Sequence, residues 1–520
     1  AAVAAPHVQA TEAGRAILAE GGNAIEAMVA MAATIAVVYP HMNSIGGDGF
    51  WLIGAPGGRV RAIEACGFAG RGATIARYRQ LGGEAIPSRG AEAALTVPGT
   101  IGGWRLALQL SASQGGRIPL ADLLGNAVRL AREGYPISAS EARTIPIEYE
   151  SLREAPGFAE THLHDGKPPK LGEIRRAAAI AETLDHLARA GLDDFYRGDV
   201  GREIAADLAR MRAPVTREDL AAYRAQWREP LSTRLNDATL FNTPPPTQGL
   251  ASLMLLGLFE RLDVRRRDEF AHFHGLIEAT RRALAARDRI CVDFDDLKPD
   301  WASVLAPEAL DREAATISRT KASSLDNKPA EGGTVWMGAI DAAGRAVSFI
   351  QSSYWEYGSG CVLPTTGVLM SNRGLAFSLD PSSPNRLRPG RRPFHTLNTP
   401  LAYFDDGRIV SHGAMGGDGQ PQFQAQVLTG YRFGGKIAEA LAAPRFLVGR
   451  TWGASSSTVK LEGDFDDGVA QALAKAGHPI ERTEAPHSDL FGHAGMLARS
   501  GKGAIEAAHD PRSDGAAAGF

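Results

Sequence analysis

A threonine stands at the start of an apolar run in the segment EGGTVWMGAID, residues 331–341, directly behind two glycines. A threonine hydroxyl is a weak nucleophile unless a base lies beside it. One way to supply that base is to make the threonine the first residue of a chain, so that its own α-amine accepts the proton. Thr334 could therefore act as a nucleophile if the chain were cut after Gly333. Its hydroxyl could make that cut by attacking the preceding carbonyl, which a glycine leaves uncrowded. Taken alone, the pattern also fits a loop that enters a strand.

Glycine-rich turns could meet the second requirement of acyl transfer, which is a set of donors for the developing oxyanion. The segment AMGGDGQPQ, residues 414–422, follows a strand-like run, and the backbone N–H groups of Gly416 and Gly417 are candidate donors. A plain tight turn is the alternative. The tetrapeptide GGDG also occurs at residues 46–49, but neither copy fits a Walker or dinucleotide-binding pattern. A nucleotide-binding loop is therefore not predicted.

Other polar residues support weaker interpretations. His487, Asp489 and His493 have the side chains of metal ligands, but solvated loop residues are the favoured interpretation, and no metal site is predicted. The arginine-rich segment NRLRPGRRP, residues 385–393, is typical of a solvated loop and could alternatively hold a substrate carboxylate by bidentate contacts. No cofactor is expected, because nucleophile, base and oxyanion donors would all be protein groups.

The composition is that of an ordinary globular protein. Of the 520 residues, 44% are apolar and 22% are charged, and the net charge of −3 argues against the basic field typical of nucleic-acid binding. The longest apolar run, residues 27–38, is shorter than the roughly 20 residues of a membrane-spanning helix, so no membrane association is expected. Cys66, Cys291 and Cys361 lie far apart, which favours a reducing compartment over a disulfide scaffold. We expect a cytoplasmic protein, or a periplasmic one if a leader has been removed.

Hydrophobic periodicity predicts the elements that would position these residues. Helices are expected at residues 11–20, 27–38 and 268–290, and Asn23 with Glu26 resembles the capping box that begins a helix. The polar segment at residues 320–333 is typical of an exposed linker.

The chain becomes strand-rich after this linker. TVWMGAI and RAVSFIQS, joined by DAAG, predict a β-hairpin, and strand-like runs follow at CVLP, GVLMS and RIVSHGA. In the first strand, Val335, Met337 and Ala339 would face one side, and Trp336 and Ile340 the other. A boundary is therefore predicted at Gly333.

Several longer segments, in their order and spacing, resemble the gamma-glutamyltransferase family over nearly the whole chain. They are GGNAIEAMVAMAATIAVVYPHMNSIGGDGFWLI, VPGTIGGW, PPPTQG, HGLIEATRRALAARDR, GGTVWMGAIDAAGRAVSFIQS, GSGCVLPTTGVLMSN and GAMGGDGQPQ. The resemblance implies an N-terminal-nucleophile hydrolase of the α+β class, folded as a four-layer αββα sandwich and made as a precursor that cleaves itself. It implies a large subunit of residues 1–333 and a small subunit of residues 334–520, which together form one αββα unit; a heterotetramer is a possible assembly.

The resemblance also assigns roles to individual residues. Thr334 takes the place of the nucleophile and new N-terminus, and Ser352 that of the threonine that hydrogen-bonds the catalytic amine. Gly416 and Gly417 take the places of the residues that provide the oxyanion-hole amides.

The chain departs from gamma-glutamyl enzymes where those enzymes hold the substrate. Cys66, in EACGFAG, stands near the expected arginine for the α-carboxylate. Arg373 begins the stretch RGLAF, where an acidic pair for the α-amine is expected. The expected serine pair is replaced by His395 and Thr396, and the asparagine expected after Ser352 by Tyr354. A buried ammonium group would lack an acidic partner in such a pocket.

These departures are similar to the branch of the family that hydrolyses oxamate to oxalate and ammonia in purine breakdown. A small anionic amide without an ammonium group fits the exchange of acidic residues for Arg373 and His395. The residues expected to contact the substrate are Arg373, His395, Thr396, Tyr354 and Arg71. Two alternatives stay open: a gamma-glutamyl or cephalosporin-type acylase, and an uncleaved, non-catalytic relative that acts as a binding protein.

Overall fold

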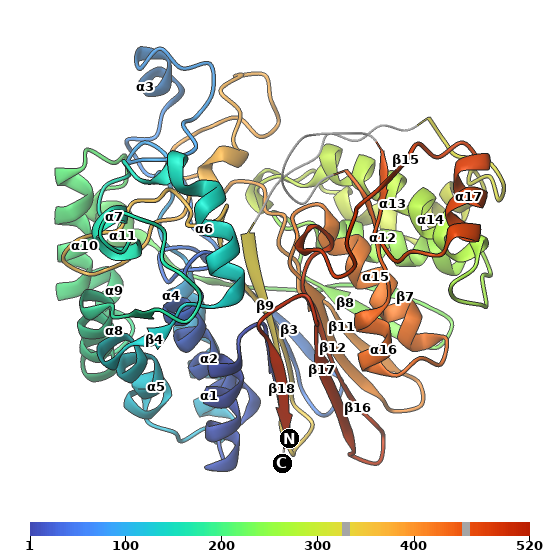
Figure 1. Cartoon of the computed structure of the whole chain (residues 1–520), viewed down its shortest axis with the longest axis horizontal. Helices are drawn as coiled ribbons and strands as arrows, with labels where there is room; N and C mark the ends of the chain where they lie inside the picture. Colours follow the sequence, from blue (N-terminus) through green and yellow to red (C-terminus); the bar gives the residue numbers. More distant parts are fainter. Residues whose placement is uncertain (325–332, 450–457, 520) are drawn as a thin grey trace.

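The computed structural model describes residues 1–324, 333–449 and 458–519, and in it two antiparallel sheets lie face to face between layers of helices (Figure 1). The first sheet has the strand order β18 (Ala516–Gly519), β1 (Ala2–Ala5), β9 (Gly333–Ile340), β10 (Ala346–Tyr354), β2 (Asp48–Gly54), β3 (Val60–Ala65) and β6 (Gln226–Arg228). The second has the order β17 (Ile505–His509), β16 (Ala494–Arg499), β12 (Ile409–Ala414), β11 (Leu401–Phe404), β8 (Ala238–Asn242) and β7 (Leu231–Arg234).

Each sheet is covered on one face by the other sheet and on its opposite face by helices, and apolar side chains pack on both faces. Between the sheets lies a core that includes Phe50, Leu52, Trp336, Leu401 and Leu497. The Trp336 ring packs so closely against two glycines of the second sheet that a Cβ at Gly413 or Gly495 would collide with it.

Helices cover the outer face of each sheet. On the first sheet lie α1 (Val8–Ala19), α2 (Ala24–Val38) and α4 (Thr100–Ser113), with α5 (Leu120–Glu133) and α8 (Ala178–Ala190) packed outside them. On the second lie α12 (Gly249–Glu260) and α15 (Gly419–Arg432), flanked by α13 (Phe270–Ile290) and α16 (Ile437–Ala442). The molecule is thus an α+β protein with the predicted four-layer αββα sandwich.

Further elements lie around this sandwich. The helices are α3 (Ile75–Gln80), α6 (Ala139–Leu152), α7 (Phe158–His162), α9 (Asp194–Arg197), α10 (Asp199–Arg210), α11 (Arg217–Ala222), α14 (Pro307–Ala314) and α17 (Asp467–Lys475). Two small sheets contain β4 (Tyr135–Pro136) with β5 (Ile174–Arg175), and β13 (Phe446–Val448) with β14 (Val459–Leu461) and β15 (Ile480–Arg482).

Local sequence explains the elements nearest the site. The predicted capping box forms at the start of α2: Asn23 Oδ1 accepts from the N–H groups of Ile25 and Glu26, and Glu26 Oε2 accepts from the N–H of Asn23 at 2.8 Å. The predicted alternation of β9 is confirmed. Val335 and its alternate neighbours pack against the helices, whereas Trp336 and Ile340 face the second sheet.

Two predicted strands, at CVLP and GVLMS, are wrong. These runs form only isolated bridges, one between Val362 and Leu369 and one between Met370 and Gly46. The chain reverses between them, with Gly367 at a positive φ, and the N–H of Val362 donates to Pro156 outside any sheet. Of the predicted linker at residues 320–333, residues 325–332 lie outside the described residues.

Each sheet combines strands from both sides of Gly333. The first sheet takes β1, β2, β3 and β6 from before it and β9, β10 and β18 from after it, and the second sheet is mixed in the same way. The chain ends also pair, since β1 and β18 lie side by side (Figure 1). A cut at Gly333 would therefore leave two fragments that share one core.

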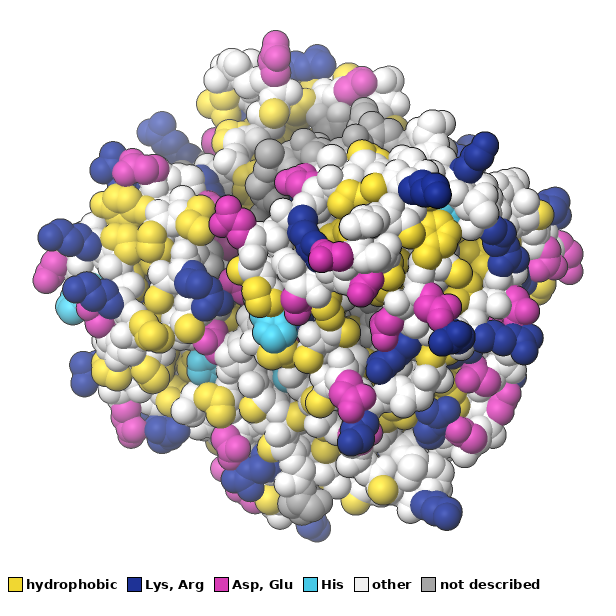
Figure 2. Space-filling model, turned by 45° about the vertical axis from the view of Figure 1, so that its right-hand side comes forward, with side chains coloured by type: hydrophobic (Ala, Val, Ile, Leu, Met, Phe, Trp, Pro, Cys, Tyr) yellow, Lys and Arg dark blue, Asp and Glu magenta, His cyan; other side chains and the backbone are white. Residues whose placement is uncertain are grey.

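The surface carries charges of both signs. Acidic and basic side chains are interspersed over the face shown in Figure 2. Among the described residues, no helix combines the length and apolar character needed to cross a membrane.

Candidate active site

Thr334 lies buried near the start of β9, next to Ser352 on the adjacent strand β10. The Thr334 hydroxyl donates to Ser352 Oγ at 3.1 Å, and Ser352 in turn donates to the carbonyl oxygen of Gly333 at 2.6 Å. The N–H of Tyr354 donates to the same Ser352 oxygen at 2.8 Å. The donor and both acceptor positions of the Ser352 hydroxyl are therefore used. This arrangement holds the threonine hydroxyl beside the peptide bond that precedes it.

Tyr354 connects this hydroxyl pair to a buried cation. The pairing of β9 and β10 shifts register between Gln351 and Tyr354, and Tyr354 adopts a φ of 83°, a left-handed conformation that is uncommon for a bulky residue. Its ring lies against the Arg373 guanidinium, whose Cζ is 3.8 Å from the ring centroid. Strained backbone of this kind clusters at functional sites.

Arg373 is a buried cation with no anion beside it among the described residues. It is 1% exposed, and within the same residues none of its three guanidinium nitrogens has a hydrogen-bond partner. Every other buried arginine in the described part of the chain has a carboxylate within ion-pair distance. Burial lowers the pKa of Arg373, partly offset by Tyr354 and Asp48. An unpaired buried cation is costly, which makes Arg373 a candidate site for an anionic ligand.

Asp48, His395 and Thr396 add further unpaired polar atoms near this cation. Asp48 Oδ2 lies 4.0 Å from His395 Nε2. In the part of the chain that the structure describes, this oxygen, both His395 ring nitrogens and Thr396 Oγ1 have no hydrogen-bond partner. Burial raises the pKa of Asp48 to about 7, although the N–H of Gly67 and the charge of Arg373 oppose the shift. Burial, with the nearby charge of Arg373, holds the pKa of His395 well below its usual value, so this imidazole is neutral at pH 7.

The second GGDG turn is held by a buried network. Gly416 and Gly417 both have positive φ values, 127° and 51°, and lead directly into the N-terminus of α15. Gln248 Nε2 donates to the carbonyl of Gly417 at 2.8 Å and also to the carbonyl of Thr396. Arg287 donates to Gln248 Oε1 at 2.8 Å and pairs with Asp418. The network joins the segment of His395 and Thr396 to the glycine turn. The N-terminus of α15 follows this turn and favours negative charge nearby.

The structure brings most of the predicted residues together but not Arg71. Thr334, Ser352, Tyr354 and Arg373 form one chain of contacts. The Arg71 side chain is 67% exposed, and its Nε lies 3.4 Å from Asp219 Oδ1.

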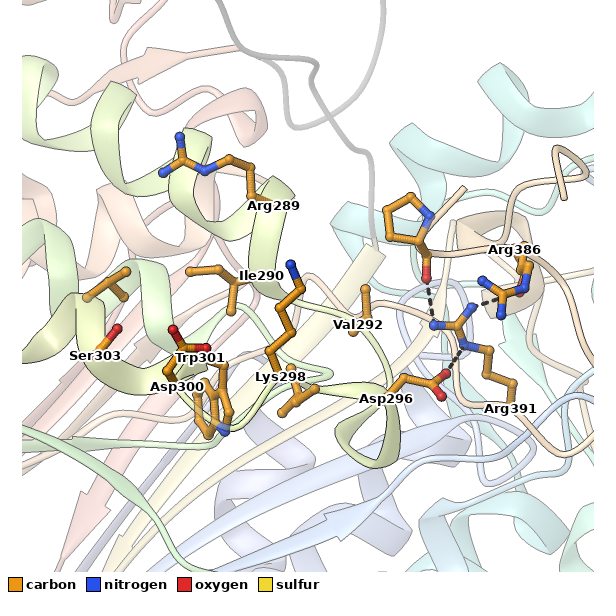
Figure 3. A pocket seen from close by; sticks show the side chains of 13 residues that line it. Arg289, Ile290, Val292, Asp296, Lys298, Asp300, Trp301, Ser303, Arg386 and Arg391 are labelled. Carbon is orange, nitrogen blue, oxygen red and sulfur yellow. Dashed lines mark hydrogen bonds and ion pairs between the residues drawn. The ribbon is translucent and has the colours of Figure 1, made fainter. Parts of the chain in front are cut away.

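The arginine-rich segment at residues 385–393 is engaged in structural contacts. Arg392 Nε lies 2.8 Å from Glu64 Oε1. Arg391 Nε lies 2.8 Å from Asp296, and its other nitrogens donate to the carbonyls of Pro384 and Arg386 (Figure 3). These contacts border a hollow of about 470 Å³, into which Lys298 and Trp301 also project. The buried members of this segment therefore already have anionic partners, unlike Arg373.

The three metal-ligand candidates do not form a metal site. His493 Nε2 contacts Asp489 Oδ1 at 2.9 Å, and His493 is buried rather than solvated. Among the described residues, no group of three or more His, Cys, Asp or Glu side chains is arranged to hold a metal ion.

The sequence alone suggested no role for Asp48 or Gln248, although both lie in segments that resemble the family, GGDGFWLI and PPPTQG. The signal for Asp48 was its position in a glycine turn that repeats the sequence of the oxyanion-hole candidate. What the sequence lacks is register: in the sheet, Asp48 stands directly opposite Ser352.

Comparisons with known proteins agree with this architecture. The family model of gamma-glutamyltranspeptidase matches residues 10–520. The chain is 48% identical over 518 residues to the oxamate amidohydrolase proenzyme of Klebsiella pneumoniae, covering 99% of this chain and 98% of that protein. It is 35% identical over 526 residues to the glutathione hydrolase-like YwrD proenzyme of Bacillus subtilis, covering 100% and 98%. The solved structure of a cephalosporin acylase from Bacillus halodurans matches with a TM-score of 0.91 at 32% identity, covering 100% of this chain and 95% of that one. The chain belongs to the gamma-glutamyltranspeptidase family.

Proposed function

We propose that this chain is a precursor that cleaves itself between Gly333 and Thr334 and then hydrolyses a small amide that carries a carboxylate, with oxamate as the substrate. Members of the family are hydrolases that act on amides, and the relatives from Klebsiella pneumoniae and Bacillus subtilis are named as proenzymes. The observation that carries the proposal is the buried, unpaired Arg373, connected through Tyr354 to the Thr334–Ser352 pair.

Self-cleavage would use the hydrogen bonds around Gly333. The Thr334 hydroxyl attacks the Gly333 carbonyl carbon, and the Ser352 hydroxyl, which donates to the carbonyl oxygen, stabilises the negative charge that develops there. Breaking the C–N bond transfers the acyl group to the Thr334 oxygen as an ester, and the nitrogen takes up the hydroxyl proton to become the free α-amine. Water then hydrolyses the ester, which releases a carboxylate on Gly333 and restores the Thr334 hydroxyl.

The new amine would act as the base in amide hydrolysis. It accepts the hydroxyl proton as Thr334 attacks the amide carbon, and the N–H groups of Gly416 and Gly417 stabilise the oxyanion. The protonated amine then gives its proton to the departing nitrogen, so that ammonia leaves and an acyl ester stays on Thr334. Water hydrolyses the ester and restores the free enzyme. Every step uses groups of the protein, the substrate and water.

The polar groups near Arg373 favour a small anion as the substrate. A carboxylate beside Arg373 would pair the free guanidinium, and Thr396 offers a hydroxyl donor. The ion pairs of Arg391 and Arg392 leave Arg373 as the buried cation available to a substrate. Oxamate places its carboxylate directly next to the amide carbon. The 48% identity to an oxamate amidohydrolase proenzyme supports the same choice.

Mass spectrometry and one activity assay test the proposal. We expect the purified protein to contain two fragments that meet between Gly333 and Thr334, and to release ammonia from oxamate but no glutamate from glutathione. Turnover of glutathione or of a glutaryl amide in place of oxamate would instead favour a gamma-glutamyl or cephalosporin-type acylase. A single uncut chain with none of these activities would overturn the proposal and favour a non-catalytic binding protein.

A further inference from the structure

Asp48 has an unusual position for a buried acid. It begins β2 opposite Ser352, and its side chain is 2% exposed. One carboxyl oxygen, Oδ1, accepts from the N–H of Gly67 at 2.8 Å, which fixes the group. The other, Oδ2, lies 4.0 Å from His395 Nε2 and has no hydrogen-bond partner in residues 1–324, 333–449 and 458–519. The free oxygen is therefore on the side of the carboxyl group nearest His395.

Arg373 lies close enough to Asp48 for each to shift the pKa of the other, yet the two do not form an ion pair within 4.0 Å. A cation and an acid that are buried together normally close into such a pair, as Arg445 does with Asp510 at 2.6 Å. The separation leaves an unpaired guanidinium and an unpaired carboxyl oxygen for a ligand that can satisfy both. A carboxylate satisfies both only if Asp48 carries a proton, because two carboxylates cannot share a hydrogen bond without one.

We propose that Asp48 binds the substrate as the neutral acid: it donates a hydrogen bond to the carboxylate that Arg373 holds, so that capture of the anion is accompanied by uptake of one proton. This inference rests on the proposed function and names a specificity-determining residue in the same site. An ionised Asp48 would instead neutralise Arg373 and repel the substrate. Asp48 thus selects anions by its protonation state as well as by its position.

The charges that face Asp48 support this assignment. Burial raises its pKa to about 7, so that the free site holds a mixture of the two forms near neutral pH. Its charged or titratable neighbours are Arg373, His395, Cys66, Tyr196 and Tyr223. Burial favours the neutral form of His395, both tyrosines and Cys66, so that Arg373 is the neighbouring charge at pH 7. An anion bound to Arg373 cancels that charge and raises the pKa of Asp48 further.

The sign of the pH effect follows from this shift. Below pH 7 the free protein already carries the proton on Asp48, and affinity for the anion is at its full value. Above pH 7 a proton must be taken up on binding, so affinity falls about tenfold for each pH unit until the pKa of the complex is reached. Proton uptake per bound anion rises over the same interval from about zero to about one.

Calorimetry on the mature protein measures this uptake directly. The probe is pyruvate, which has the shape of oxamate and no cleavable amide, titrated at pH 5.5 and pH 8.5 in buffers of different ionisation enthalpy. We expect about zero protons taken up at pH 5.5 and about one at pH 8.5 in the wild-type protein. Asp48→Asn keeps the acceptor for Gly67 and carries a permanent donor, so it should bind pyruvate with no proton uptake and no loss of affinity at pH 8.5. His395→Gln is the matched control, and it should keep the proton uptake.

The outcomes separate this inference from the proposed function. Wild-type protein that releases ammonia from oxamate but binds pyruvate without proton uptake at pH 8.5 would overturn the role of Asp48 alone. Uptake that persists in Asp48→Asn and disappears in His395→Gln would assign the proton to His395 and overturn it equally. Absence of both amide hydrolysis and pyruvate binding would instead overturn the proposed function.

Discussion

The tetrapeptide Gly-Gly-Asp-Gly occurs twice in this chain, and its two copies serve different structures. In the first, a Cβ at Gly47 would collide with the carbonyl oxygen of Ser352, and Asp48 begins β2 with one oxygen unpaired. In the second, Gly416 and Gly417 form a turn with positive φ, and Asp418 stands at the residue before α15 and pairs with Arg287. Both aspartates are 1% exposed.

The difference between the two copies lies in their partners. Asp418 belongs to a closed network with Arg287 and Gln248, which anchors the turn and needs no ligand. Asp48 and Arg373 lie near one another without pairing. Buried polar groups in folded proteins are normally satisfied, so a group left open at a defined position indicates a place for a ligand. The same four residues can therefore be fully paired in one turn and leave a buried carboxyl oxygen open in the other.

The largest expected effect tests whether the region around the first turn is reactive at all. Thr334→Ala removes the hydroxyl that would serve both cleavage and turnover, so both should be lost, with ammonia release from oxamate falling at least about 10⁴-fold. Intact-mass measurement and an ammonia assay check this. Thr334→Ser is the control, and it should still cleave because it keeps a hydroxyl at the same place. A Thr334→Ala protein that is still cut after Gly333 and active would rule out Thr334 as the nucleophile.

Matched substitutions compare the two aspartates directly. Of the carboxylates that the structure describes, Asp418→Asn leaves Arg287 with only the half-exposed Asp288 as a partner. It should destabilise the fold by about 3 kcal/mol, seen as a lower melting temperature. Asp48→Asn should not lower it. Because burial raises the pKa of Asp48 from 3.8 to about 7, its stabilising contribution is complete below pH 4 and is lost as the pH rises through 7.

It follows that Asp48→Asn should melt at a higher temperature than the wild type at pH 8 and at a similar temperature at pH 4. Thermal melting of the wild type, Asp48→Asn and Asp418→Asn at pH 4 and pH 8 checks both expectations. Equal destabilisation by the two substitutions would remove the distinction between the two turns.

Arg373 tests the unpaired side of the comparison by kinetics. Arg373→Ala should raise KM for oxamate about 10- to 150-fold, the equivalent of about 1.5–3 kcal/mol for a charge-assisted contact, without lowering the melting temperature. The KM of Arg373→Lys should lie between those of the wild type and Arg373→Ala, because lysine keeps the charge and loses the planar guanidinium. Steady-state kinetics on the mature protein provide the measurement. An unchanged KM would mean that the carboxylate binds elsewhere.

Sequence reasoning reached one part of this site more easily than the other. The period-two pattern placed Val335 and Trp336 on opposite faces of a strand, and the glycines before Thr334 marked its possible chemistry. The runs CVLP and GVLMS, wrongly expected to be strands, are also apolar. Their backbone groups bond to each other across a turn and to Pro156 and Gly46, and join no extended sheet. Composition alone could not distinguish these cases, because the partners of a strand are set by tertiary contacts.

The layered fold and the partners of Asp48 needed more than local pattern. The αββα arrangement was inferred from the family resemblance, since no local rule shows that β1 pairs with β18 at the other end of the chain. The pairing state of each buried arginine likewise depends on residues far away in the sequence. Arg71, Arg373 and Arg392 have the same chemistry, and only their burial and partners in the structure separate them.

Arg71 provides the smallest expected effect and the sharpest negative control. Its side chain is 67% exposed and contacts Asp219 at 3.4 Å, so Arg71→Ala removes a screened surface pair that contributes about 0–0.5 kcal/mol. KM for oxamate should stay within about twofold of the wild type, and melting should be nearly unchanged. The same kinetic assay used for Arg373→Ala checks it. If Arg71→Ala raised KM as much as Arg373→Ala, burial and pairing would not identify the substrate-binding arginine. The distinction between unpaired and paired buried polar groups would then not indicate where a ligand binds.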